Sequence, residues 1–144
     1  MRPLYFDPRR PDMAIVFTMT AGAGMVQGDR HRIDVTCEPG SALHLTTQSA
    51  TKVQRMDDDY ATSVVNLTAA EGCLLEYLPD PIIPCGGSRS YHRTRVSVAP
   101  GATAIVGETV RAGRLAHGEE SLSGLDAEPR ARLVYQLQRR FTRE

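Results

Sequence analysis

Apolar and polar residues alternate along three separate stretches of this 144-residue chain. The stretches are Arg32–Cys37, Val65–Thr68 and Arg95–Val98, and in each one aliphatic residues or cysteine take turns with charged, amide or hydroxyl residues. A period of two with many β-branched residues predicts strands that bury one face and expose the other. The apolar run in Met13–Met19 predicts a further strand.

A short turn signal follows each alternating stretch: proline or glutamate, and then Gly40, Gly72 or Gly101. Proline sets the φ angle of the first corner of a type II turn, and glycine supplies the positive φ of the second. Tight hairpins prefer the mirror-image turns, so these corners are expected to carry the chain between layers instead of back along one sheet. New strands are then predicted over Ala42–Thr47, Cys73–Leu78 and Ala102–Val110.

The three corner glycines are 32 and 29 residues apart, so strand, turn and strand recur as a unit. A unit of this length cannot bury an apolar face alone, whereas stacked units would build a continuous core. The sequence therefore predicts a mainly β fold of stacked strand layers, either solenoid-like or sandwich-like. An ordinary β-sandwich, whose hairpins resemble each other only in composition, stays open as the alternative.

The pattern weakens after Gly118, and Glu119–Pro129 has the composition of a linker. Beyond it, Arg130–Phe141 places apolar residues at helical spacing, although a strand fits part of the segment as well. We therefore predict a C-terminal helix. The expected organisation is one β-rich domain over residues 1–120 and a divergent tail over residues 121–144 that is helical or partly ordered.

Acidic and basic residues number 17 each, and Lys52 is the only basic residue that is not arginine. The balance argues against nucleic acid or an anionic membrane as the main partner. Because guanidinium groups bind carboxylates as a planar fork, the arginines favour contacts with other proteins. The polar, proline-rich start is unlike a signal peptide, and three cysteines without a CxxC pair are typical of reduced thiols in the cytoplasm.

Three patterns suggest chemistry, and each has a simpler explanation. Ser49–Lys52 matches the S-x-x-K pattern of serine acyl-enzymes, but it follows a threonine-rich strand where those enzymes have a helix. Gly22–Asp29 lacks the third glycine of a dinucleotide-binding loop, so a glycine-rich turn is favoured. The four histidines show no metal-binding spacing, which favours surface or internally satisfied positions. They are His31, His44, His92 and His117.

Two glutamates lie inside apolar runs, Glu76 in CLLEYLPDP and Glu108 in ATAIVGETV. A carboxylate on a strand with aliphatic neighbours must face solvent, pair with arginine or line a polar passage. Carboxylate oxygens attract cations, so a cation-binding lining and an ion pair explain these glutamates equally well.

Two longer strings match a known pattern. The first is TAGAGMVQGDRHRIDVTCEPGSALHLTTQSATKV (Thr20–Val53), and the second is LEYLPDPIIPCGGSRSYHRTRVSVAPGATAIVGETVRAGRLAHGE (Leu75–Glu119). The first resembles the glycine-rich stretch, Pro-Gly turn and Thr-Thr-Gln-x-Ala-Thr-Lys-Val signature of the urease accessory protein family called UreD or UreH. The second resembles that family's Leu-Glu-Trp/Tyr-Leu-Pro motif and its Gly-Arg-x-x-x-Gly-Glu close. Together the resemblance covers Met13–Glu120.

The resemblance implies a non-catalytic cytoplasmic scaffold of stacked β-strands. It implies three partners, namely UreF-like and UreG-like accessory proteins and the urease apoprotein, with a homodimer formed through the complex. No tightly bound cofactor is expected, only nickel in transit through an internal passage with a polar and acidic lining. By motif position the expected metal-contacting members of that lining are Glu76, Asp80 and Glu108. The residues of the central signature are Thr46, Thr47, Gln48 and Lys52.

The chain also departs from the family pattern. The loop LPDPIIPCGG replaces the commoner Leu-Pro-Gln-Glu-x-Ile, and family members continue well beyond the position of Glu120. The part that meets UreF is therefore expected to be shortened or missing. Two other functions stay open: a small metal-dependent enzyme using His44 or His92 with Glu76, and an interaction module without a metal role.

Overall fold

The computed structural model describes residues 3–5, 7–111 and 132–141, the last range by its backbone alone. The described strands are β1 (Met13–Thr18), β2 (Arg30–Cys37), β3 (Ala42–Thr47), β4 (Thr51–Val53), β5 (Ala61–Ala69), β6 (Leu74–Tyr77), β7 (Ile82–Pro84), β8 (Arg89–Val98), β9 (Thr103–Val106) and β10 (Arg132–Phe141). The paired strands all run parallel, and no helix occurs in the described ranges. Parallel neighbours cannot be joined by tight hairpins, so the chain coils from layer to layer.

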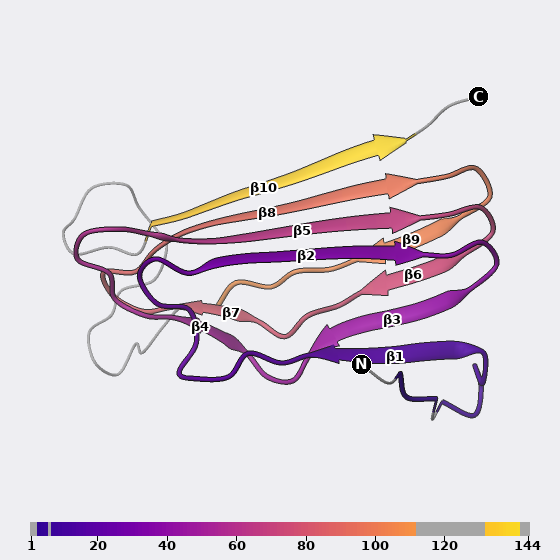
Figure 1. Cartoon of the computed structure of the whole chain (residues 1–144), viewed down its shortest axis with the longest axis horizontal. Coiled ribbons are helices and arrows are strands. Elements are labelled where there is room, and N and C mark those ends of the chain that lie inside the picture. The colour runs from indigo at the N-terminus through magenta and orange to yellow at the C-terminus, as the bar shows by residue number, and fades with distance from the viewer. Residues whose placement is uncertain (1–2, 6, 112–131, 142–144) are drawn as a thin grey trace.

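Two four-stranded sheets form the layers (Figure 1). Sheet I has the order β1-β3-β6-β9, and sheet II has the order β10-β8-β5-β2. A small third side is made by β4 and β7, which also pair in parallel. Each coil passes from a sheet II strand to a sheet I strand and then to the third side, so the predicted stacked, solenoid-like fold is confirmed. The alternative of an ordinary sandwich built from hairpins is wrong.

The predicted glycine corners connect the two sheets. Gly40, Gly72 and Gly101 have φ angles of +68°, +67° and +71°, which residues with a side chain rarely adopt. Each turn is closed by a backbone hydrogen bond of 3.1–3.2 Å between its first carbonyl and its fourth amide. The corners also stack, because the Gly40 amide donates to the Glu71 carbonyl at 3.0 Å. The repeated sequence unit therefore corresponds to one coil of the fold.

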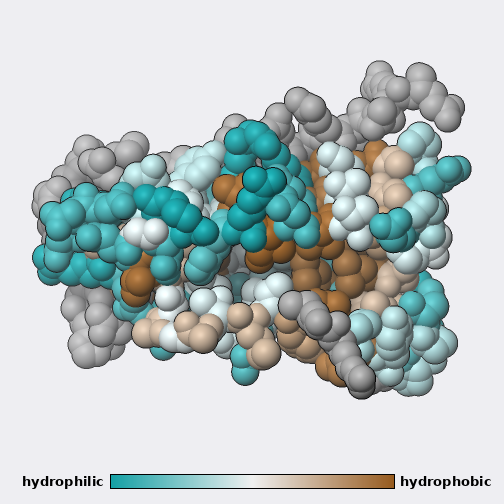
Figure 2. Space-filling model, in the orientation of Figure 1, coloured by the Kyte–Doolittle hydropathy of each residue, from teal (hydrophilic) through white to brown (hydrophobic). Residues whose placement is uncertain are grey.

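The main core lies between the two sheets. Inward-facing aliphatic residues of β3, β5 and β6 meet there, and Leu75 is fully buried at its centre. Neighbouring members are Leu45, Val65, Leu67 and Val96. A smaller cluster around Met25 and Val53 fills the third side. Figure 2 shows apolar residues gathered across the middle of the viewed face, with hydrophilic residues to either side.

The C-terminal helix predicted for Arg130–Phe141 is wrong over the residues that the structure describes. Residues 132–141 form β10, which pairs in parallel with β8 along its whole length. The edge of β8 offers the segment a complete ladder of backbone hydrogen bonds. This tertiary pairing outweighs the helical spacing of its apolar residues. The predicted domain boundary at residues 120 and 121 lies outside the described residues.

Candidate functional site

A cavity of about 590 Å³ lies at one end of the space between the sheets. The strands of sheet I and sheet II point in opposite directions (Figure 1), so the carboxyl ends of one sheet meet the amino ends of the other there. Sheet I contributes Thr47, Asp80 and Glu108, which follow or end its strands, while sheet II contributes His31 and His92. Carboxylates, imidazoles and hydroxyls from three successive coils therefore converge on one space.

The three predicted metal-contacting acids do not share this cavity. Asp80 and Glu108 line it, whereas Glu76 is not among its lining residues. Alternation along β6 turns Tyr77 inward and Glu76 outward, and the Glu76 carboxylate accepts a bond from His44 Nδ1 at 2.8 Å. The structure therefore brings Asp80 and Glu108 together in one lining and places Glu76 on the opposite face of its strand.

Glu108 occupies the most protected acidic position in the cavity. The Thr94 hydroxyl donates to its Oε1 atom at 3.1 Å, and burial raises the pKa of the carboxyl above its ordinary value despite that bond. The pKa of the Tyr77 phenol is raised as well, mainly by burial and then by the Glu108 charge. Burial makes the charged form of Glu108 unfavourable, so a cation that enters the cavity would stabilise this carboxylate.

Two histidines give the cavity nitrogen donors. His92 is 5% exposed on the inward face of β8, and its Nε2 atom lies 3.2 Å from the Ser90 hydroxyl. Burial, and then the neighbouring His31, lower the pKa of His92 from 6.5 to about 4. Near neutral pH the His92 imidazole is therefore uncharged, which is the form that binds metal ions.

We expect the pH dependence of stability to reveal this buried neutral histidine. Because the pKa of His92 is about 4 in the folded chain and near 6.5 when unfolded, the unfolded chain binds more protons between these pH values. The contribution of His92 is complete above pH 6.5 and is lost as the pH falls towards 4, with a slope of up to about 1.4 kcal/mol per pH unit.

Urea unfolding of the parent chain and of one variant at several pH values tests this expectation. His92→Gln should lose less stability than the parent chain between pH 6.5 and 4, because it removes the buried neutral imidazole. The comparison between chains cancels the opposite dependence expected of Glu108. Equal slopes in the parent and His92→Gln would contradict the buried neutral state.

No group of three or more His, Cys, Asp or Glu side chains within the described part of the chain lies close enough together to hold a metal ion. His92 faces the cavity and Glu76 faces outward, so the structure does not bring together that pair of the enzyme hypothesis. His44 and Glu76 do meet, as a two-residue contact on the outer face of sheet I. None of the described residues belongs to a helix with the length and apolarity needed to cross a bilayer.

Comparison with known proteins assigns the chain to a family. The family model described as UreD urease accessory protein matches residues 1–134. The chain belongs to the UreD urease accessory protein family. The resemblance seen in the sequence is thereby confirmed.

Three named UreD relatives illustrate the similarity. "Urease accessory protein UreD 2" of Streptomyces griseus is 56% identical over 119 residues, or 83% of this chain. "Urease accessory protein UreD 3" of Methylorubrum populi is 43% identical over 85% of this chain, and "Urease accessory protein UreD" of Yersinia enterocolitica is 40% identical over 87% of it. The matched parts make up 41%, 40% and 38% of those relatives, so the chain spans about two fifths of their length.

Thr46 and Thr47 hold the segment that carries Asp80. Thr46 donates to the Leu78 carbonyl at 2.7 Å, and the Thr47 hydroxyl accepts the Asp80 amide at 2.9 Å. Thr47 Oγ1 also lies 3.5 Å from Asp80 Oδ2. Two neighbouring threonines therefore fasten the following coil from opposite faces of β3.

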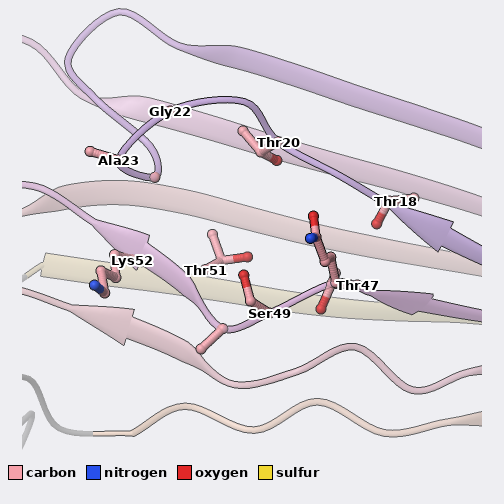
Figure 3. A pocket seen from close by; sticks show the side chains of 11 residues that line it. Thr18, Thr20, Gly22, Ala23, Thr47, Ser49, Thr51 and Lys52 are labelled. Carbon is pink, nitrogen blue, oxygen red and sulfur yellow. The ribbon is translucent and has the colours of Figure 1, made fainter.

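The other two residues that the resemblance places in the central signature line a second, smaller pocket of about 160 Å³. Gln48 and Lys52 lie there opposite the glycine-rich turn at Gly22–Gly24, and Thr47 lines both this pocket and the larger cavity. Figure 3 shows the Lys52 amine directed away from the Ser49 hydroxyl. Lys52 belongs to strand β4 and Ser49 to the loop before it, so the helix-face pair of a serine acyl-enzyme is not formed.

Sequence reasoning missed the inward row of β8. Ser90, His92 and Thr94 are all buried, and they continue the inward face on which Val96 packs in the core. Their alternation with arginine and tyrosine was a usable signal, because period two places all of them on one face of a strand. Polar residues on an inward face mark a place where the core gives way to a polar cavity.

Proposed function

We propose that this chain is a cytoplasmic, non-catalytic scaffold of urease maturation that assists nickel insertion into the urease apoprotein. Its proposed partners are UreF-like and UreG-like accessory proteins and the apoprotein itself, with a homodimer arising through the complex. The family assignment supports a role in urease maturation.

The cavity between the sheets is the observation that carries the nickel role. Asp80 and Glu108 supply carboxylate oxygens, and His31 and His92 supply imidazole nitrogens, both of which suit a divalent transition metal. A passage must bind its cargo well enough to admit it and weakly enough to release it. Dispersed donors meet that requirement better than one closed set of ligands, so nickel is proposed as cargo and not as a resident cofactor.

Nickel titration of the purified chain tests the passage directly. Isothermal titration should show weak binding that falls in steps in Asp80→Asn, Glu108→Gln and the double variant. Glu76→Gln is the matched control, because its carboxylate lies on the outer face and should leave nickel binding unchanged. One tight stoichiometric site would contradict the passage and favour the metal-dependent enzyme. Unchanged nickel binding in the double variant would contradict the assignment of Asp80 and Glu108 to the passage.

Glu108→Gln is also expected to separate stability from function. The variant keeps an acceptor for Thr94 but carries no charge to bury, so it should be more stable than the parent at neutral pH. Since the pKa of Glu108 is raised in the folded chain, the stability advantage of the variant should shrink as the pH falls and the Glu108 carboxyl of the parent becomes protonated. Urea unfolding of both chains at pH 7 and pH 4 measures this difference in stability.

The companion measurement is nickel content and activity of urease after coexpression with the partner proteins. Glu108→Gln should lower both, although the variant chain is the more stable one. Full urease activation by Glu108→Gln would contradict the role of this carboxylate. Absence of any association between the parent chain and the accessory or urease proteins would contradict the scaffold itself.

A further inference from the structure

Two of the chain's three cysteines lie beneath neighbouring corners of the coiled fold. Cys37 ends β2, and Cys73 comes directly before β6. Each residue is 2% exposed, and both belong to the core cluster between the sheets. The turn residues beside them, 38–41 and 71–72, are exposed. Both thiols are therefore buried, and at this end of the core they are covered by turns that solvent reaches.

Contacts of the backbone and of the side chains place the two thiols next to each other. The Ala70 amide donates to the Cys37 carbonyl at 3.0 Å, and the Cys73 amide donates to the Ala70 carbonyl at 3.2 Å. Cys37 Sγ lies 3.7 Å from the carbonyl oxygen of Leu74, the residue after Cys73. Burial, and then a hydrogen bond with the Cys37 thiol, raise the pKa of the Cys73 thiol to about 11. The two sulfur atoms are therefore neighbours across the corner.

The repeat explains from which sides the two thiols approach. Parallel pairing aligns Cys37 of β2 with Ala69 of β5 and Val98 of β8, so the first coil has its thiol at the end of a sheet II strand. Cys73 stands one residue after the corner glycine of the second coil, where the first coil has Ser41. The contact therefore links sheet II in one coil to the start of a sheet I strand in the next.

We propose that Cys37 and Cys73 form a reversible disulfide when the chain meets a hydroperoxide, and that this bond joins two successive coils. Disulfides require their two cysteines to be close before the reaction, and here both thiols already meet in the reduced chain. A hydroperoxide suits the site because it is small enough to reach thiols beneath a turn after local opening. Exchange with a bulkier disulfide would require a wider opening of the corner.

The reaction with hydrogen peroxide balances in two steps. The Cys37 sulfur attacks one peroxide oxygen, so an S–O bond forms, the O–O bond breaks, and the leaving hydroxide takes up the thiol proton as water. The Cys73 sulfur then attacks the sulfenic sulfur, the S–O bond breaks, and hydroxide leaves with the second thiol proton as water. The two thiols together lose two electrons to the peroxide. Since the raised pKa keeps Cys73 protonated, we assign the first attack to Cys37.

The disulfide would stabilise the fold without entering the proposed nickel passage. It would close a loop that contains β3, β4 and β5, and such a constraint lowers the entropy of the unfolded chain. The thermal unfolding midpoint should therefore rise by roughly 5–10 °C on oxidation. Neither cysteine lines the cavity that carries Asp80 and Glu108, so this inference and the nickel role can fail independently.

Mass spectrometry of the full chain, first reduced and then incubated with hydrogen peroxide, tests the proposal. Remaining thiols are alkylated under denaturing conditions before proteolysis. The digest should contain one pair of peptides joined through Cys37 and Cys73, with Cys85 alkylated, and dithiothreitol should separate the pair. Differential scanning calorimetry of the reduced and oxidised chains measures the shift of the midpoint.

Cys85→Ser is the matched control. Cys85 lies on the third side of the coil, where its amide donates to the Val53 carbonyl at 2.9 Å, so this variant should form the disulfide like the parent. Cys37→Ser and Cys73→Ser should each lose both the disulfide and the midpoint shift. A disulfide to Cys85, disulfides only between chains, or unlinked Cys37 and Cys73 after incubation with peroxide would overturn the proposal. A Cys37–Cys73 disulfide that lowers the midpoint would overturn it as well.

Discussion

Replacement of Leu75 by alanine is expected to lower the free energy of unfolding by about 3 kcal/mol, near the middle of the range for buried leucines. Leu75 has no exposed surface and packs between the sheets against residues of three coils. Truncation removes apolar contact area and leaves a cavity that the stacked backbone cannot close, because both sheets are held in place by parallel ladders. The loss should appear as a lower urea midpoint at unchanged slope.

Leu78→Ala is the matched control for Leu75→Ala. Leu78 is 40% exposed on the outer side of sheet I, three residues further along the same coil, so its truncation should cost less than about 1 kcal/mol. Similar losses in the two variants would contradict a core placed between the sheets. A changed urea slope in Leu75→Ala would indicate that the coils unfold separately instead of together.

Gly24→Ala is expected to cost about 3 kcal/mol of folding free energy by combining backbone strain with a clash. Gly24 has a φ of +110°, and an added Cβ would fall against the carbonyl oxygen of Lys52 and 3.0 Å from its carbonyl carbon. That carbonyl cannot move away, because it accepts the Met25 amide at 2.8 Å. The glycine therefore allows the turn to lie directly on β4.

Gly22→Ala separates the two causes. Gly22 has a similar φ of +115°, but a Cβ there would meet nothing within 4 Å, so this variant reports the strain alone. Thermal and urea unfolding should place Gly22→Ala between the parent and Gly24→Ala. Equal stabilities of the two variants would show that contact with Lys52 adds nothing to the strain.

Local chemistry predicts the corners at Gly40, Gly72 and Gly101, and the structure has all three at positive φ between the sheets. Strand β3 has the predicted bounds, whereas β6 and β9 end earlier than predicted. Pro79 lacks the amide that would extend the parallel ladder from β6, and Gly107 follows β9, so pairing stops sooner than the apolar runs do.

The candidate site is harder to predict from the sequence than the corners are. Motif position groups Glu76 with Asp80 and Glu108, but only Asp80 and Glu108 line the cavity, and Glu76 faces the other way. His92 was treated as a scattered histidine, although its neighbours on β8 alternate in the manner of an inward face. Motif position describes order along the chain, whereas membership of a lining depends on the face of each strand and on the coil beside it.

Local pattern by itself established the strands, the corners and the stacking of similar units, because turn geometry and period-two burial act within a few residues. Tertiary structure decided which strands became neighbours, on which face each acid lies and whether Arg132–Phe141 coils or extends. Those outcomes depend on backbone partners and on space supplied by residues some 30 positions away, as in the His44–Glu76 contact. Local patterns can therefore be recognised in the sequence, whereas strand partners and the orientation of side chains are fixed only when distant segments meet in the fold.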